Sequence, residues 1–369
     1  MKKINLKNLS AVLAAVISLL YIFGFSGINK LSSIKVKPQL IGKMQEQRAS
    51  FTATLLPNGK VLIAGGFKKG KDGYSQIYFN DAEIYDPAEK TFREIGKMHD
   101  YRCSHHAVLL KNGDVLILGG YDGKGSTASA EIFDPKTEMF TKINKMNEPR
   151  VSFTATLLND GRVLIAGGKS AEIFNPSDNS FSEIKTSGID RGGHQAVLLK
   201  NGKVLIAGGS RGRDRVLANA KIFDPRTNSF SETGRMNIPR RKFAAVLLNN
   251  GNVLVMGGSD KNDWQNQFSS AEIYNVKTGT FNPAANMNAK RFKFYSSVVE
   301  FKKGNIIICG GNRLIEMFDQ TANQFKRLGE MDNPYYFSSA VLLNNDSILI
   351  LGGYTDKIKV TDNAWLLKL

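Results

Sequence analysis

Residues 52–66 read Thr-Ala-Thr-Leu-Leu-Pro-Asn-Gly-Lys-Val-Leu-Ile-Ala-Gly-Gly, and this stretch decides the fold. Two short apolar runs flank Asn58-Gly59, a dipeptide that accepts the positive φ angles of a tight β-hairpin turn. Gly65-Gly66 ends the second run. The stretch therefore predicts two antiparallel strands followed by a backbone turn that requires glycine.

The same pattern recurs along the rest of the chain. Its 369 residues exceed the roughly 250–300 residues at which a single compact core stops growing, so a repeated unit is expected. The Gly-Gly pairs are spaced by 41 to 54 residues, as in the blades of β-propellers. They begin at Gly65, Gly119, Gly167, Gly208, Gly257, Gly310 and Gly352. Seven pairs predict seven blades.

Each repeat continues with a variable loop and a third apolar run, which reads Ala-Glu-Ile-Tyr-Asp-Pro at residues 82–87. In six repeats the aromatic residue of this run is followed seven positions later by phenylalanine. The pairs are Tyr85/Phe92, Phe133/Phe140, Phe174/Phe181, Phe223/Phe230, Tyr274/Phe281 and Phe318/Phe325. This spacing predicts one four-stranded antiparallel sheet per repeat, with aromatic rings filling the gaps between neighbouring sheets.

The seventh repeat lacks a fourth strand, because the chain ends at Leu369 soon after the third run. The missing strand is expected near the other end of the chain. Residues 41–44 (Ile-Gly-Lys-Met) repeat residues 95–98, which end the fourth strand of the first repeat. We therefore expect residues of about 34–42 to complete the last blade and close the ring, which removes open sheet edges.

The N-terminal residues 1–29 form a separate segment, and residues 30–369 form the propeller. Lys2, Lys3 and Lys7 precede an uncharged, mostly apolar stretch over residues 8–29. This order predicts a hydrophobic helix that acts either as a cleaved signal peptide or as a retained membrane anchor. Both alternatives place the propeller outside the cytoplasm, at the cell surface, in the periplasm or secreted, with membrane association only if the segment is kept.

Together these repeats resemble the kelch repeat. Their amino-acid sequences are similar to those of bacterial kelch proteins related to the propeller domain of galactose oxidase. The resemblance covers about residues 34–369, with phenylalanine where kelch blades commonly have tryptophan. It implies an all-β, seven-bladed kelch-type propeller. Kelch propellers mostly bind proteins or glycans and a minority are enzymes, so the fold alone does not define a function.

In such a blade, the loops between blades and the loops after each Gly-Gly pair lie on one face, here called the loop face, around the central channel. An arginine lies seven residues before the same aliphatic position of the first strand in six repeats: Arg48, Arg102, Arg150, Arg191, Arg240 and Arg291, with Tyr335 in the seventh. The pattern fits two interpretations. The arginines form a ring that binds carboxylate, sulfate or phosphate groups, or they tie loops together.

The loops after the Gly-Gly pairs differ between repeats and are the candidates for specificity. They carry Lys68 and Tyr74 in the first repeat, Arg211 and Arg213 in the fourth, and Trp264 in the fifth. Aromatic residues beside cations suit a carbohydrate or a peptide. Solvated basic loops with no binding role would have the same composition.

The charge favours anionic partners. The net charge is +17, and it falls to +14 when the first 26 residues, with three lysines and no acids, are removed. We expect a monomer that recognises a protein or an acidic glycan. An exported chain without a nucleic-acid-binding motif is not expected to bind nucleic acid in vivo. Cys103 and Cys309 fall in different repeats and are expected to be separate thiols.

No catalytic residue can be named from the sequence, and we expect no cofactor or metal. Galactose oxidase holds copper with two histidines and two tyrosines, and no matching set can be carried over to this sequence. Its four histidines are His99, His105, His106 and His194. The working hypothesis is therefore a binding protein. The alternatives are a sialic-acid mutarotase-like isomerase, with an acid or base among Glu46, Asp100, Glu148 and Asp332, or, less favoured, a galactose-oxidase-like oxidase.

Overall fold

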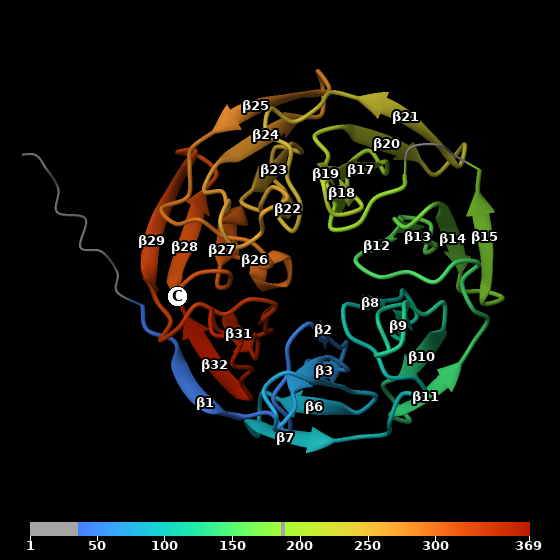
Figure 1. Cartoon of the computed structure of the whole chain (residues 1–369), viewed down its shortest axis with the longest axis vertical. Coiled ribbons are helices and arrows are strands. Elements are labelled where there is room, and N and C mark those ends of the chain that lie inside the picture. The colour runs from blue at the N-terminus through green and yellow to red at the C-terminus, as the bar shows by residue number, and fades with distance from the viewer. Residues whose placement is uncertain (1–35, 186–188) are drawn as a thin grey trace, which may run out of the picture. The chain divides into compact units, whose positions relative to one another are not determined.

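The computed structural model describes residues 36–185 and 189–369. These residues form seven four-stranded antiparallel sheets arranged around a central channel (Figure 1), so the predicted all-β, seven-bladed propeller is confirmed. The predicted hydrophobic helix over residues 8–29 lies outside the described residues. In the part of the chain that the structure describes, no helix is long and apolar enough to cross a membrane.

The strands follow the chain order around the ring. Blade 1 contains β2 (Thr52–Leu55), β3 (Val61–Ala64), β6 (Ala82–Asp86) and β7 (Thr91–Glu94). Blade 2 contains β8 (His106–Leu109), β9 (Val115–Leu118), β10 (Ala130–Asp134) and β11 (Met139–Lys142). Blade 3 contains β12 (Thr154–Leu157), β13 (Val163–Ala166), β14 (Ala171–Asn175) and β15 (Ser180–Ile184). Blade 4 contains β16 (Gln195–Leu198), β17 (Val204–Ala207), β20 (Ala220–Asp224) and β21 (Ser229–Thr233).

The remaining blades keep the same order. Blade 5 contains β22 (Ala244–Leu247), β23 (Val253–Met256), β24 (Ala271–Asn275) and β25 (Thr280–Ala284). Blade 6 contains β26 (Val298–Glu300), β27 (Ile306–Ile308), β28 (Leu314–Asp319) and β29 (Gln324–Glu330), with 3-10 turns at Tyr295–Ser297 and Lys302–Gly304. Blade 7 contains β30 (Ser339–Leu342), β31 (Ser347–Leu351), β32 (Asn363–Lys368) and β1 (Gln39–Lys43).

Blade 7 joins the first described strand to the last. β1 pairs antiparallel with β32, with Gln39 opposite Leu366 and Lys43 opposite Asn363. The strand begins after Pro38, which has no N–H to donate to a ladder. Upstream of this proline, Val36 instead forms a parallel bridge to Gly329 of blade 6.

The core consists of apolar clusters between neighbouring blades. Between blades 7 and 1, for example, Tyr85 packs with Leu349 and Leu351. The six predicted aromatic pairs are all in contact, with ring centroids 4.7 to 4.9 Å apart. The prediction that aromatic rings fill the gaps between sheets is therefore confirmed.

Two buried histidines form hydrogen bonds between blades. His105 Nε2 lies 3.0 Å from Thr52 Oγ1, and His194 Nε2 lies 2.9 Å from Thr154 Oγ1. Phenylalanine occupies the histidine position in blades 1, 3, 5 and 6, which supports the interpretation of this position as a packing site. Burial holds the pKa of both histidines well below the usual value of 6.5.

These histidines should make the fold sensitive to acid. Because their pKa values are lower in the folded than in the unfolded chain, the unfolded chain binds more protons below pH 6.5, and stability falls as pH drops below that value. Each pKa unit of this difference corresponds to about 1.4 kcal/mol. Replacing His105→Phe and His194→Phe together should reduce the loss of unfolding free energy between pH 7 and pH 5. Chemical denaturation at both pH values measures it, and an unchanged loss would contradict the assignment.

Candidate functional site

The loop face is built by interlocking loops. Residues that lead into a blade pair with the loop after the Gly-Gly of that blade, as in the bridges Ala49–Phe67 and Tyr336–Tyr354. Others pair with the loop of the preceding blade, as in Thr127–Arg150. The two sets of loops therefore lie together, as predicted from the blade topology.

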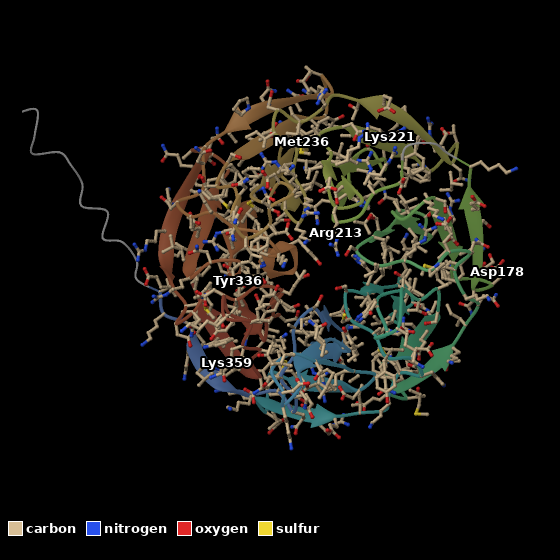
Figure 2. The ribbon with its side chains drawn as sticks, viewed as in Figure 1. Asp178, Arg213, Lys221, Met236, Tyr336 and Lys359 are labelled. Atoms are coloured by element: carbon tan, nitrogen blue, oxygen red, sulfur yellow. The ribbon has the colours of Figure 1, made fainter. Side chains whose placement is uncertain are left out.

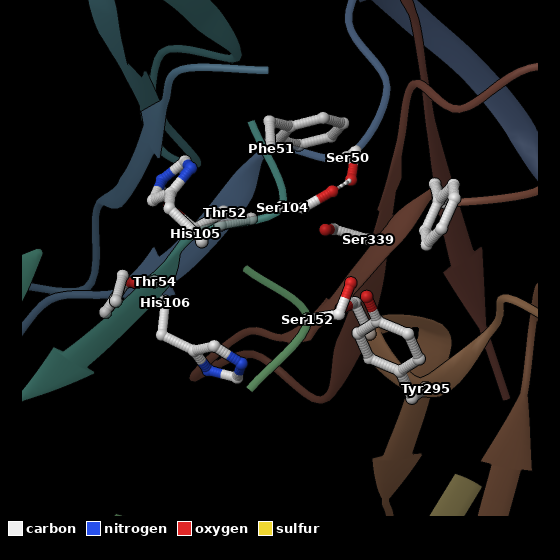
Figure 3. A pocket seen from close by; sticks show the side chains of 14 residues that line it. Ser50, Phe51, Thr52, Thr54, Ser104, His105, His106, Ser152, Tyr295 and Ser339 are labelled. Carbon is white, nitrogen blue, oxygen red and sulfur yellow. Dashed lines mark hydrogen bonds between the residues drawn. The ribbon is translucent and has the colours of Figure 1, made fainter. Parts of the chain in front are cut away.

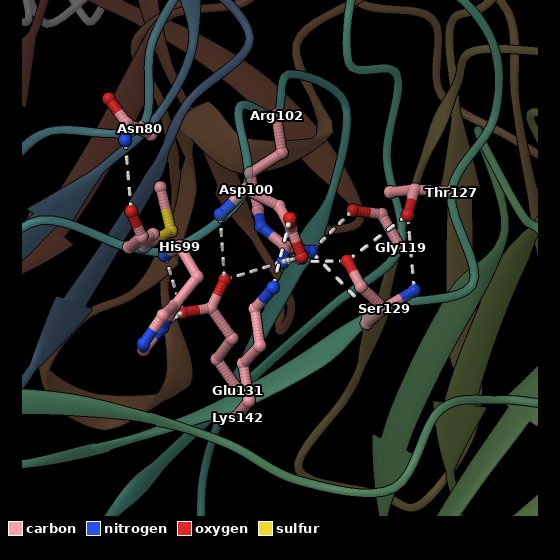
Figure 4. A network of polar contacts seen from close by, with 10 residues as sticks. Asn80, His99, Asp100, Arg102, Gly119, Thr127, Ser129, Glu131 and Lys142 are labelled. Atoms are coloured by element: carbon pink, nitrogen blue, oxygen red, sulfur yellow. Dashed lines mark hydrogen bonds and ion pairs between the residues drawn. The ribbon is translucent and has the colours of Figure 1, made fainter.

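The arginine before each first strand is buried inside this loop layer. Arg102 is fully buried, and its guanidinium donates to the Gly119 carbonyl at 2.9 Å and to Glu131 at 2.8 Å (Figure 4). The other oxygen of Glu131 accepts the backbone N–H of His99 at 2.8 Å. The Arg102 carbonyl accepts an N–H from Gly66 of the preceding blade. One arginine thus ties the end of its own second strand, its third strand and a neighbouring blade together.

The same network recurs in five blades. In each, the arginine pairs with a buried glutamate of the third strand, and this glutamate also accepts a loop N–H three residues before the arginine. The pairs are Arg48–Glu83, Arg102–Glu131, Arg150–Glu172, Arg240–Glu272 and Arg291–Glu316. Burial of Glu83 raises its pKa, against the opposing effect of Arg48.

Blades 4 and 7 depart from this network. In blade 4, Lys221 replaces the glutamate, and Arg191 donates to the carbonyls of Gly208 and Asn219. In blade 7, Tyr335 is buried and its hydroxyl lies 3.1 Å from Asp332.

The structure therefore places the six arginines and Tyr335 within the fold. Their side chains are at most 3% exposed, so they do not present groups to a ligand on the loop face, and we exclude them from the candidate site. The main partners of five of the arginines are the third-strand glutamates, which were not singled out from the sequence. Asp100 and Glu148, named above as candidate acids or bases, lie farther away, at 3.8 and 3.6 Å from Arg102 and Arg150.

Breaking one of these buried pairs should strongly destabilise the propeller. The variant Arg150→Met leaves Glu172 as an uncompensated buried charge, which typically costs about 3–5 kcal/mol. The matched control is Arg93→Met, which breaks the exposed pair with Glu138 and should cost less than about 1 kcal/mol. Denaturant unfolding of both variants measures the difference. Equal effects would show that the buried pair has no special role.

A cluster of aromatic and charged side chains lies on the loop face of blades 5 to 7. We call it the rim cluster and define it as Arg241, Lys242, Asp263, Trp264, Phe292, Lys293, Tyr336, Phe337 and Tyr354. Trp264 stands edge-on to Phe292 and Tyr336, with ring centroids 5.0 and 5.1 Å away. Its side chain is nevertheless 45% exposed. It therefore offers an aromatic surface at the rim.

Lys293 lies inside the rim cluster. Its ammonium is 4.8 Å from the ring centroids of Trp264 and Phe292, and it donates to the Tyr354 hydroxyl at 3.0 Å. The residue is 9% exposed, and among the described residues no carboxylate forms an ion pair with it. Burial, together with nearby Lys242, lowers its pKa from 10.5 to about 8.

The rim cluster carries excess positive charge. Asp263 pairs with both Arg241 and Lys242 and accepts a hydrogen bond from Ser259. One carboxylate therefore faces three cations, Arg241, Lys242 and Lys293. This arrangement leaves a net positive charge beside an aromatic surface, which suits an anionic ligand with an apolar face.

The channel is encircled by residues in the left-handed backbone conformation. The residue two positions after each arginine, or after Tyr335, has φ between 50° and 65°. In six of the seven steps, its N–H donates to the carbonyl of the equivalent residue in the preceding blade at 2.7 to 3.1 Å. We call these seven residues the channel ring: Ser50, Ser104, Ser152, Gly193, Lys242, Lys293 and Phe337. The ring is polar in blades 1 to 3 and cationic or aromatic in blades 5 to 7.

A cavity of about 230 Å³ extends into the channel from this ring (Figure 3). Ser50 and Ser104 line it and are hydrogen-bonded to each other at 2.8 Å. Further hydroxyls in its lining come from Ser152, Tyr295, Ser296 and Ser339. The lining contains no carboxylate. Phe337 belongs both to the cavity wall and to the rim cluster, so the two features adjoin at this residue, although Lys242 and Lys293 do not line the cavity.

The loop residues proposed from the sequence differ in their location and in their contacts. Lys68 pairs with Glu46 at 2.5 Å, and Arg211 pairs with Asp190 at 3.1 Å. Tyr74 is 89% exposed, at the tip of the hairpin formed by β4 (Phe67–Lys69) and β5 (Gln76–Tyr78). Only two of the proposed residues are found at or beside the rim cluster.

Those two residues are Trp264 and Arg213. Trp264 belongs to the cluster itself. Arg213 follows β18 (Ser210–Arg211) and precedes β19 (Arg215–Val216), and it lies close to the channel mouth (Figure 2). Its carbonyl accepts a hydrogen bond from Arg241 at 3.3 Å.

Lys293, Lys242 and the serines of the channel ring were not predicted from the sequence. The position two residues after the arginine varies among serine, glycine, lysine and phenylalanine, but the position one residue after it varies as well. The sequence therefore carries no signal that distinguishes these residues from other loop positions.

Comparison with known proteins supports the propeller assignment. The kelch motif matches residues 48–99, 102–147 and 240–288. No curated protein matches the chain. Among solved structures, a fungal alcohol oxidase of the AA5 family, described in complex with copper, is similar with a TM-score of 0.72 and 16% identity. The match covers 90% of this chain and 76% of the oxidase. At this identity the likeness concerns the fold alone.

In residues 36–185 and 189–369, the side chains do not fit a copper site. Among the described residues, no three histidine, cysteine, aspartate or glutamate side chains gather closely enough to hold a metal ion. His105 is bonded to Thr52, and His106 Nε2 lies 2.7 Å from the Phe153 carbonyl. Cys103 and Cys309 are both buried and unbridged, as expected.

Proposed function

Since the chain is a kelch-repeat β-propeller, we propose that it is an extracytoplasmic binding protein that recognises an acidic glycan at the rim cluster. The observation that carries this proposal is Lys293, a buried cation among aromatic rings without a carboxylate partner in the described chain. Burying an ammonium is costly unless it is paired. An anionic group of a ligand would supply the missing partner.

The other members of the rim cluster fit a sugar. The exposed part of Trp264 can stack against the apolar face of a sugar ring, while Lys242 and Arg241 add positive charge. Polar groups that fix orientation beside an aromatic wall are typical of small-ligand sites. A protein partner that presents an acidic side chain would use the same groups, and it is the alternative ligand.

The cavity gives less support to a mutarotase-like isomerase. Of the acids considered for that role, Glu46 pairs with Lys68, Asp100 and Glu148 lie beside buried arginines, and Asp332 is bonded to Tyr335. In the cavity itself, the groups that exchange protons are histidines and Tyr295. Burial raises the pKa of Tyr295 to about 12, which disfavours it as a base near neutral pH.

Substitutions in the rim cluster should weaken binding. We expect Trp264→Ala and Lys293→Met each to reduce affinity for acidic oligosaccharides at least about tenfold, because each removes a central contact. Lys203→Met is the matched control, since Lys203 pairs with Asp224 near the turn between β16 and β17, away from the loop face. Binding by the full-length protein is measured on a glycan array and by calorimetry at two salt concentrations. Equal affinity for wild type and all variants would contradict the proposal.

Binding should also weaken at alkaline pH. With a pKa of about 8, most Lys293 side chains are charged at pH 7 and about a tenth at pH 9, so affinity should fall roughly tenfold between these values. Of the neighbouring groups, burial acts to raise the pKa of Asp263, but the hydrogen bond from Lys242 and the other contacts of this carboxylate together lower it, and burial raises the pKa of Tyr354. Lys293→Arg should bind with little change from pH 7 to pH 9. The same decline in this variant would exclude Lys293 as the group responsible.

A further inference from the structure

We propose that the channel cavity binds the terminal sugar of the acidic glycan end-on, with the serines that line the cavity recognising its hydroxyl groups. This inference rests on the proposed function and adds a ligand-binding subsite to it. It is carried by the distribution of side chains around the channel ring, by the unpaired hydroxyls of the cavity and by the size of the cavity.

The channel ring presents different chemistry on its two sides. Blades 1 to 3 contribute Ser50, Ser104 and Ser152, whereas blades 5 to 7 contribute Lys242, Lys293 and Phe337. An acidic sugar has the same division, with hydroxyls on most ring carbons and one carboxylate. The ring therefore matches a sugar whose hydroxyls face blades 1 to 3 and whose carboxylate faces blades 5 to 7.

The cavity offers hydrogen-bonding groups that the fold does not use. Among the described residues, the hydroxyls of Ser152 in blade 3, Ser296 in blade 6 and Ser339 in blade 7 make no hydrogen bond to protein, and all three residues line the cavity, so free hydroxyls face the cavity from both sides. The ring of Tyr295 lies 6.2 Å from that of Phe337, which adds an aromatic wall. Figure 3 shows Ser152, Ser339 and Tyr295 around the same space as the Ser50–Ser104 pair. Serine hydroxyls donate and accept, as sugar hydroxyls do.

The size of the cavity selects a single sugar. Its volume of about 230 Å³ lies below the roughly 300–1,000 Å³ of sites for drug-sized ligands. One sugar ring fits this space, but an internal residue would need room for a neighbour on both sides. The chain end is therefore the part that enters, and the next residues lie across the rim, near Trp264 and Arg213.

The channel ring itself supplies the substitutions for a test. Gly193 shows that the left-handed backbone accepts glycine, so Ser50→Gly, Ser104→Gly and Ser152→Gly can be combined without backbone strain. Phe337 shows that the same position accepts phenylalanine, so Ser152→Phe should fill the cavity while the blade stays folded. Thermal unfolding checks that both variants keep the wild-type fold.

The experiment is calorimetry on the full-length protein with monosaccharide and oligosaccharide probes. The acids are D-glucuronic acid, D-galacturonic acid, N-acetylneuraminic acid and an oligogalacturonate, and the neutral controls are D-glucose and D-galactose. We expect at least one monosaccharide acid to bind, its affinity to fall at least about tenfold in the triple glycine variant, and binding to be lost in Ser152→Phe. The neutral sugars should bind at least about tenfold more weakly than the matching acid.

Two other outcomes separate this inference from the proposed function. If an acidic oligosaccharide binds in a Trp264-dependent manner, but the triple glycine and Ser152→Phe variants bind it like wild type, the end-on subsite is overturned and the rim cluster remains the binding site. If no acidic sugar binds to the folded wild-type protein, both the subsite and the proposed glycan ligand are overturned.

Discussion

The propeller depends on the contact between each buried arginine and the two Gly-Gly turns beside it. The guanidinium donates to the first glycine carbonyl of its own blade, while the arginine carbonyl accepts an N–H from the Gly-Gly of the preceding blade. The second glycine lies close to the segment that leads into the first strand of its blade. At Gly66, an added Cβ would lie 2.9 Å from Phe51 Cβ. The network therefore explains why arginine and the glycine pairs recur together, and why the blades keep their spacing.

This fixed network leaves other positions free to vary. The residue two positions after the arginine is held in the left-handed conformation by backbone hydrogen bonds, so its side chain contributes little to blade geometry. The chain places serine, glycine, lysine and phenylalanine there. The loops after the Gly-Gly turns vary in the same way, and one of them brings Trp264 to the rim cluster. Packing and recognition thus use separate residues of one repeat, as expected for a rigid scaffold that carries variable loops.

The fold could be predicted almost completely because its signals are local and repeated seven times. The Asn-Gly turns, the Gly-Gly pairs and the seven-residue aromatic spacing each define strands without reference to distant residues. The site was harder to predict because its members come from three blades: Trp264, Lys293 and Tyr354 meet only when the ring is formed. The arginines were the most regular polar feature, and the sequence left two interpretations open, a ring that binds anions or ties between loops. Their burial and the third-strand glutamates support the second interpretation.

The pairing of β1 with β32 also determines how the two ends of the folded chain respond to force. Gln39, at the start of β1, lies opposite Leu366, near the end of β32, so these two strand ends lie at the same end of their ladder. Force applied at these two residues would open the ladder one hydrogen bond at a time, rather than shear it all at once. The seam between β1 and β32 would therefore open from this end. During synthesis the same seam cannot form until β32 has been made, because β1 pairs with that strand.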